Sequence, residues 1–196
     1  MNIYGEKVFL RAMEPEDMEM YREMVNDPEI ERMLGGWSFP VSSVEQRQWY
    51  ERVVTDKRNL RFTIEDRSTG EALGMIYLSE LDWKNRTAVY GMKLKKDAPK
   101  RRGYASDAEF TLMRYAFREL GLHRLSSEVL DYNTPSIGTK EKCGAKREGM
   151  KRSAVFKEGA YHDVICYGVL YEDFLDAVKR AGWSGNMSEK KEDGRA

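Results

Sequence analysis

A short basic run joins a predicted strand to the longest predicted helix of the chain. Its members are Lys100, Arg101, Arg102, Gly103, Tyr104 and Ala105. The glycine lets the backbone pass close to a ligand, and a helix that begins at Tyr104 or Ala105 presents unpaired N–H groups beside the positive end of its dipole. This arrangement predicts an anion site that suits a phosphate or pyrophosphate. The plain alternative for the cations is a solvated surface.

Length and composition narrow the class of protein. A chain of 196 residues that is 41% hydrophobic and 34% charged is typical of one soluble domain with a real core. Lys and Arg together number 33, as do Asp and Glu, so the global basic excess of a nucleic-acid-binding protein is absent. No apolar run reaches the length of a membrane span. Two cysteines without metal-type spacing and two histidines predict a cytoplasmic protein without a metal site.

Hydrophobic periodicity and turn residues predict one α/β domain around a mixed sheet. The expected strands cover 7–11, 60–65, 72–81, 86–94 and 124–130, with a final hairpin of 155–156 and 161–170. The expected helices begin near 14, 44, 105 and 135; the Ser-x-x-Glu pattern at Ser42 caps the second, and Asn26-Asp27-Pro28 ends the first. We expect the domain to span residues 1–176 and a polar, flexible tail to span 177–196.

Three motifs in order carry a resemblance to a known family. They are residues 100–105, residues 133–149 with Asn-x-x-Ser followed by Glu-Lys-x-Gly, and residues 159–163 with Gly-x-Tyr-x-Asp. With them, residues 7–173 resemble the GNAT superfamily of acetyl-coenzyme-A-dependent N-acetyltransferases, in the branch of the ribosomal-protein N-terminal and spermidine N-acetyltransferases. The resemblance implies a single α/β domain with a mostly antiparallel sheet and a splayed central strand pair flanked by helices.

The resemblance also implies how acetyl-coenzyme A would be held. Backbone groups of Met92, Lys93 and Leu94 would bind the pantetheine arm, and the basic run would bind the pyrophosphate. Asn133 would hydrogen-bond the pantetheine from the next strand, with a turn residue before Thr134-Pro135 as the alternative. No metal is implied.

The motifs also point to candidate catalytic groups. Lys140 occupies the position of the tyrosine that commonly serves as general acid in this family. It would act near the departing thiolate, or else be an exposed helix lysine or contact a coenzyme A phosphate. Glu128 is a candidate base, with a paired surface residue as the alternative. Tyr90 and Tyr104 are candidate members of a proton relay.

The acceptor is expected to be a primary amine: a peptide or protein N-terminus, a polyamine, or a small amine. Trp37 and Phe39 lie in a loop that by family analogy borders the acceptor site, although they could equally staple the following helix. A homodimer is a further possible form of the protein. The alternative function is a non-catalytic module that binds coenzyme A as a sensor or serves as an interaction domain, which the lysine at position 140 favours.

Overall fold

The computed structural model describes residues 2–36 and 39–185. In chain order the elements are β1 (Ile3–Tyr4), β2 (Val8–Arg11), a 3-10 turn (Pro15–Asp17), α1 (Met18–Asn26), α2 (Pro28–Arg32), α3 (Ser43–Val53), β3 (Leu60–Asp66), β4 (Ala72–Asp82), β5 (Thr87–Leu94), α4 (Tyr104–Arg118), β6 (Arg124–Leu130), α5 (Thr134–Lys142), β7 (Lys146–Lys157), β8 (Ala160–Leu170) and α6 (Tyr171–Ala181). The strands form one sheet in the order β1-β2-β3-β4-β5-β6-β8-β7. The predicted α/β class is confirmed.

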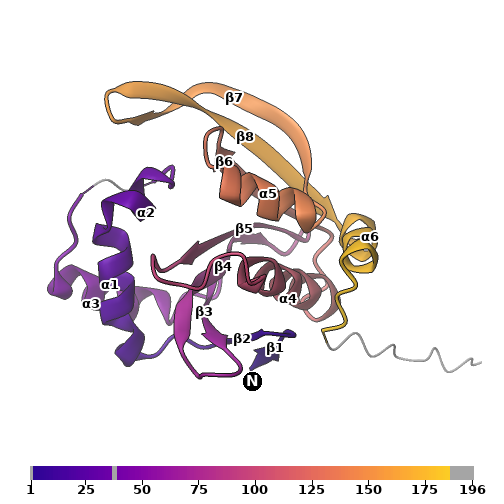
Figure 1. The fold of residues 1–196 in the computed structure, drawn as a ribbon, viewed down its shortest axis with the longest axis horizontal. Coiled ribbons are helices and arrows are strands. Elements are labelled where there is room, and N and C mark those ends of the chain that lie inside the picture. Colours follow the sequence, from indigo (N-terminus) through magenta and orange to yellow (C-terminus); the bar gives the residue numbers. More distant parts are fainter. Residues whose placement is uncertain (1, 37–38, 186–196) are drawn as a thin grey trace, which may run out of the picture.

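All neighbouring strands run antiparallel except the central pair β5 and β6. This parallel pair covers only Thr87–Val89 against Arg124–Ser126. Beyond Val89 the two strands part, and the β6-β8-β7 portion arches away from β3, β4 and β5 (Figure 1). The predicted splayed pair is therefore present, at the middle of the sheet.

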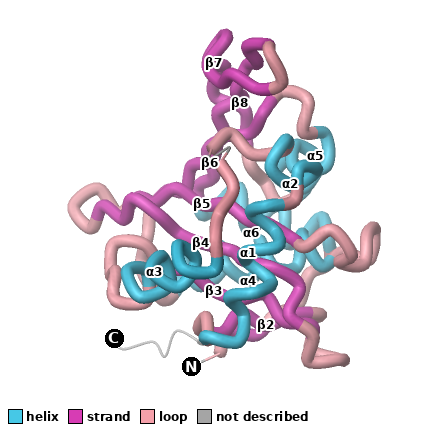
Figure 2. Tube along the Cα trace, turned by 90° about the vertical axis from the view of Figure 1, so that its left-hand side faces the viewer, coloured by secondary structure: helices cyan, strands magenta, loops and turns pink. Residues whose placement is uncertain are grey.

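Helices cover both faces of the β2-β5 portion. Leu78 and Ile76 on β4 belong to the main core, in which Phe110 and Leu112 of α4 are buried. Met75 and Tyr77, which alternate with them on the same strand, belong to a second core with Tyr21 of α1 and Trp49 of α3. Since side chains of a strand alternate between faces, α4 lies on one face and α1 with α3 on the other, as both views show (Figure 1, Figure 2).

Helix ends follow the sequence signals closely. Ser42 caps α3 by accepting from the Glu45 N–H at 3.2 Å, and the Glu45 carboxylate accepts from the Ser42 N–H in return. Asn26 is the last residue of α1, as predicted, but Asp27 and Pro28 also begin α2. The Asp27 carboxylate caps that short helix, and proline suits its first position because its missing N–H would be unpaired there.

The C-terminal region departs from the predicted boundary at residue 176. The helix α6 continues to Ala181, and Ala177, Val178 and Trp183 are buried in the main core. The indole N–H of Trp183 donates to Asp107 on α4 at 2.5 Å. The packed region therefore extends to at least Trp183, because an apolar helix face and an indole precede the polar residues, from Ser184 onward, that suggested a tail. Residues 186–196 lie outside the described part of the chain.

Candidate active site

The first turn of α4 is built to expose its backbone N–H groups. Gly103 caps the helix in the left-handed region at φ 84°, and no side chain caps it. Arg101 is also left-handed at φ 59°, so the chain turns sharply twice before the helix begins. The first N–H groups of a helix have no partner in the preceding turn, and the helix dipole adds positive potential there. The geometry of an anion site is thus present at the predicted position.

Contacts from both ends of the chain hold this turn in place. The Lys7 ammonium donates to the Arg102 carbonyl at 2.5 Å. The buried Asp107 carboxylate accepts from the backbone N–H groups of Lys7 at 2.7 Å and Val8 at 2.9 Å, besides the Trp183 indole. A carboxylate so fully hydrogen-bonded fixes β2 and the C-terminal segment against the start of α4. Nothing in the motif itself indicated this anchor.

The open edge of β5 follows from the direction of its backbone groups. The Lys95 N–H donates to Leu73 in the β4 direction at 2.9 Å, and the Lys93 carbonyl lies against Gly74 of β4. Since alternate residues direct their N–H and C=O groups to opposite sides, the main chain of Met92 and Leu94 faces the side from which β6 has departed. The main chain of Lys93 faces β4 instead, so of the three predicted residues only Met92 and Leu94 present backbone groups to the opening.

Asn133 joins α5 to α2. Its side-chain oxygen caps α5 by accepting from the Ser136 N–H at 3.2 Å, and its amide donates to the Met33 carbonyl at 2.9 Å. The adjacent Tyr132 hydroxyl donates to the Arg32 carbonyl at 2.6 Å. The end of α2 thus bridges to the end of β6, across from β5. The turn alternative for Asn133 describes what the side chain does here, and its contact to pantetheine stays a prediction.

Another lysine reaches the first turn of α4 from α5. The Lys142 ammonium donates to the hydroxyl of Ser106 in the first turn of α4 at 3.1 Å. This places a positive charge beside the N–H groups of that turn. The sequence signal was available, because Lys142 belongs to the Glu-Lys-x-Gly motif, but the motif alone did not place it here.

Lys140 lies inside the protein, between α5, α4 and β5. It is 3% exposed, its ammonium lies 2.7 Å from a carboxylate oxygen of Glu109, and it lies 3.7 Å from the ring centroid of Tyr90. The alternative of an exposed helix lysine is therefore wrong. The Tyr90 hydroxyl and the second Glu109 oxygen are buried without a hydrogen-bond partner in the described structure. Burial raises the pKa of Tyr90 well above its ordinary value, so this hydroxyl stays protonated.

The other candidates lie nearer the surface. Glu128 is 52% exposed and ion-paired with Lys151 of β7, on the face of β6 opposite the buried Ser127 and Val129. The Tyr104 hydroxyl donates to Asp66 at 2.5 Å, at the end of β3. Phe39 is 67% exposed, and Trp37 lies outside the described residues. The structure shows no contact of Glu128, Tyr104 or Phe39 with Lys140.

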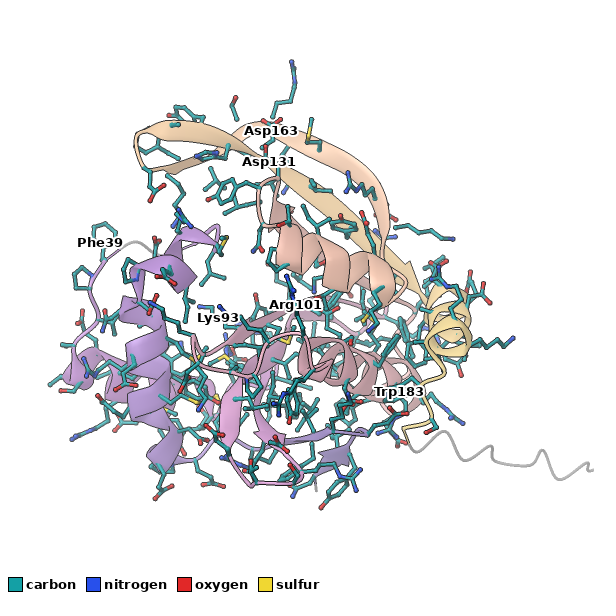
Figure 3. All side chains as sticks on the ribbon, in the orientation of Figure 1. Phe39, Lys93, Arg101, Asp131, Asp163 and Trp183 are labelled. Atoms are coloured by element: carbon teal, nitrogen blue, oxygen red, sulfur yellow. The ribbon has the colours of Figure 1, made fainter. Side chains whose placement is uncertain are left out.

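Figure 3 places Arg101 beneath α5 and Lys93 between the strands and α1, so the two labelled cations flank the end of β5. The donor-side elements predicted from the motifs therefore converge where β5 and β6 part: the N-terminal turn of α4, the open edge of β5 and the start of α5. A helix N-terminus beside a gap in a sheet suits an extended ligand with a phosphorylated end.

Comparison with known proteins agrees with this architecture. Residues 7–146 match the model of the acetyltransferase (GNAT) domain, so the chain belongs to the GNAT acetyltransferase family. It is an acyltransferase of the N-acetyltransferase class. It is 36% identical to the SPbeta prophage-derived uncharacterized N-acetyltransferase YokL of Bacillus subtilis, over 87% of this chain and 93% of that protein. It is 28% identical to the putative ribosomal N-acetyltransferase YdaF of the same organism, over 87% and 94%.

Solved structures extend the likeness to the tertiary level. Spermidine N-acetyltransferase from Vibrio cholerae, crystallised with CoA and spermine, superposes with a TM-score of 0.79 at 25% identity and covers 86% of this chain and 98% of that one. A probable acetyltransferase superposes with a TM-score of 0.72 at 27% identity, covering 85% and 94%. None of the helices in the described part of the chain is long and apolar enough to cross a membrane.

Proposed function

We propose that this protein transfers the acetyl group of acetyl-coenzyme A to a primary amine by direct attack in a ternary complex. The observation that carries the proposal is the uncapped, glycine-led start of α4 beside the separating strands β5 and β6. The family to which the chain belongs, and a structural neighbour crystallised with CoA, support the same donor.

The donor would lie along the opening with its phosphates at α4. Backbone N–H groups of residues 103–105, together with Lys100, Arg101 and Arg102, would neutralise the pyrophosphate. The main chain of Met92 and Leu94 would hydrogen-bond the pantetheine amides, and Asn133 would approach from the opposite side. A side chain at Gly103 would come within 3.2 Å of the Lys7 ammonium and would strain a left-handed residue, so this turn fits only glycine well.

The chemistry sets two demands on the protein. The amine nitrogen forms a bond to the thioester carbonyl carbon as the carbon–sulfur bond breaks; the amine loses a proton and the departing thiolate gains one. Deprotonation at pH 7 costs roughly 4–5 kcal/mol for a lysine-like amine with a reference pKa of ~10.4, whereas it costs about 1 kcal/mol for an α-amine with a pKa of ~7.7–8.0. We therefore propose an acceptor with a low-pKa amine and retain Glu128 as the proposed base.

Lys140 supports a second candidate function, a coenzyme-A-binding module without catalysis. The position that commonly holds an acidic tyrosine is filled by a lysine already engaged by Glu109 and Tyr90. A thiol with pKa ~8.5 is a fairly good leaving group, however, and water could protonate it. The loss of a positioned acid therefore lowers the expected rate without excluding transfer. A catalytic role for Lys140 stays a prediction.

A paired substitution tests the donor site. Gly103→Val forces a β-branched side chain into a left-handed turn where the backbone meets the phosphates, and we expect acetyl-coenzyme A to bind roughly 10- to 100-fold more weakly by calorimetry, since such strain costs about 1–2 kcal/mol before any steric loss. Gly121→Val is the matched control: Gly121 follows the other end of the same helix at φ 65°, with open space around it. If both variants lose the same affinity for acetyl-coenzyme A, the substitutions act through folding alone and the donor site is not supported.

Thiol release across an amine panel then separates the two functions. Release that depends on an added amine establishes transfer. Tight binding of acetyl-coenzyme A with no release on any peptide N-terminus, polyamine or small amine favours the binding module.

The oligomeric state and the cellular compartment of the protein are also proposals. We propose a homo-oligomer, at least a dimer, in the cytoplasm. A dodecameric structure of the Vibrio cholerae spermidine N-acetyltransferase is among the neighbours, which supports assembly. Light scattering of the purified protein measures it directly.

A further inference from the structure

Two cations share the face of the sheet that lies opposite α4. Arg61 on β3 lies in register with Tyr77 on β4, and Tyr77 with Gly91 on β5; Lys93 pairs with Met75 in the next row. Tyr77 and Met75 belong to the core beneath α1 and α3. Because these positions differ by even steps along their strands, Arg61 and Lys93 project from the same face.

Neither cation has a counter-ion among the residues that the structure describes. The Arg61 Nη1 atom is buried without a hydrogen-bond partner, and the guanidinium lies 5.8 Å from the ring centroid of Trp49. No acidic side chain in residues 2–36 and 39–185 forms an ion pair with Arg61 or Lys93. Burial lowers the pKa of Lys93 from its ordinary value, and the nearby charge of Arg61 lowers it further.

The acids nearest to the pair are already engaged. Glu31, whose charge acts on Lys93, is ion-paired with Lys157. Asp56, whose charge acts on Arg61, accepts from the side chain of Asn59 and the backbone N–H of Arg58. Withdrawing a cation from water without a partner is costly, and two adjacent cations add mutual repulsion. An anion bound between them removes both costs.

A hydroxyl completes the cluster. The Tyr77 ring lies over Gly91, since any side chain at Gly91 would collide with the Tyr77 hydroxyl. No residue in the described ranges hydrogen-bonds this hydroxyl, and burial raises the pKa of Tyr77, which keeps it a donor. The guanidinium of Arg61, the ammonium of Lys93 and the phenol of Tyr77 thus offer three kinds of donor to one anionic group.

The cluster lies beside the proposed site of transfer. Lys93 is adjacent to Met92, whose main chain faces the opening between β5 and β6, but its side chain lies on the α1 face while the phosphate-binding turn of α4 lies on the other. Figure 3 shows Lys93 on the α1 side of the strands and Arg101 beneath α5. The arrangement separates these cations from the donor phosphates and puts them where an acceptor would approach.

We propose that Arg61, Tyr77 and Lys93 form an anion subsite for the acceptor, so that the substrate carries a carboxylate or a phosphate as well as its amine. The inference rests on the proposed acetyl transfer. It argues against a polyamine, because two unpaired cations repel one, although a structural neighbour was crystallised with spermine.

Matched acceptors test the subsite. One pair is a dipeptide with a free C-terminal carboxylate and the same dipeptide as its C-terminal amide, whose α-amines differ little in pKa. The other pair is O-phosphoethanolamine and ethanolamine, and spermidine is added as a polycation. We expect kcat/KM to favour one anionic member roughly 10- to 100-fold, mostly through KM, because a charged hydrogen-bond group is lost in the neutral member. The preferred pair distinguishes carboxylate from phosphate.

Variants assign the preference to these residues. Arg61→Gln and Lys93→Met should each remove most of the preference in kcat/KM for the anionic acceptor, while the affinity for coenzyme A, measured by calorimetry, stays unchanged. Lys84→Met, on the exposed turn between β4 and β5, is the matched control and should keep it. A preference for spermidine or for the neutral members, or an equal loss of coenzyme A affinity in the variants, overturns the subsite.

A binding measurement keeps the subsite testable if no amine is acetylated. Inorganic phosphate is added to protein saturated with coenzyme A, whose own phosphates fill the α4 site. We expect phosphate to raise the thermal unfolding midpoint of the wild type and of Lys84→Met. In the double variant, Arg61→Gln with Lys93→Met, the rise should be at most half as large. Equal shifts in all three overturn the subsite, whereas absent transfer with unequal shifts overturns only the proposed function.

Discussion

Lys140 is buried and Lys93 is partly buried, and the surroundings of the two ammonium groups differ in one respect. Lys140 has a carboxylate at 2.7 Å and an aromatic face at 3.7 Å. Lys93 has the like charge of Arg61 nearby and no ion-pair partner in the described part of the chain, since Glu31, whose charge also acts on it, is paired with Lys157. At Lys140 the protein itself neutralises the ammonium charge. At Lys93 the charge is left for the proposed anionic ligand to neutralise.

This contrast changes which of the two lysines is the stronger candidate for a functional residue. The alignment makes Lys140 the conspicuous residue, because it replaces a catalytic tyrosine. The packing makes it part of the α4–α5 interface. Lys93 was expected only to offer its backbone to the cofactor, but its ammonium has no ion-pair partner in the described ranges and lies on the face proposed for the acceptor. Burial alone therefore does not distinguish a cation that binds a ligand from one that stabilises the fold, and the proposal rests on burial without a partner.

The largest expected effect comes from breaking the buried pair. Glu109→Gln leaves the Lys140 ammonium buried without a counter-ion, and we expect a loss of about 3–5 kcal/mol in the free energy of unfolding, measured by urea denaturation. Lys140→Met together with Glu109→Gln removes both charges and should recover at least half of that loss. A single variant as stable as the wild type would show that Lys140 and Glu109 are not coupled in solution.

An intermediate effect concerns catalysis and separates packing from chemistry at Lys140. In the doubly substituted protein, Lys140→Met with Glu109→Gln, we expect kcat on the best acceptor to stay within about threefold of the wild type, because the ammonium is engaged by Glu109 and Tyr90. A positioned general acid is worth ~10²–10⁴ in rate. A fall of that size in correctly folded protein would instead make Lys140 the acid and would abolish the contrast with Lys93.

The smallest expected effect is a pH dependence at Lys93. Its pKa is lowered in the folded protein, mainly by burial, so between that lowered value and about 10.5 the unfolded chain binds more protons and stability rises with pH. In phosphate-free buffer, Lys93→Met should therefore be more stable than the wild type at pH 7, with an advantage that shrinks toward pH 10.5. Urea midpoints at several pH values measure this difference. A constant difference, like that expected for the exposed Lys84→Met, would show that Lys93 is fully solvated.

Much of the donor side could be predicted from sequence because its signals are local. Gly103 at a strand-to-helix junction specifies a left-handed turn and an unpaired helix start whatever packs around it. The Ser42 cap and the stop at Asn26 are equally local and equally confirmed. Signals that depend on distant partners were missed: the anchor at Asp107, the helix α6, and the inclusion of Trp183 in the core.

The sequence by itself determined the fold class, the family and the glycine-led start of α4, where the phosphorylated donor is proposed to lie, since turn geometry and helix ends are set by a few neighbouring residues. Only the tertiary structure decided which charges have partners. Glu109 is 31 positions from Lys140, and Arg61 is separated from Lys93 by a whole strand, β4, so their proximity depends on strand register and helix packing. The electrostatic free energy of a charge depends on what surrounds it in space, and that surrounding exists only after the chain has folded.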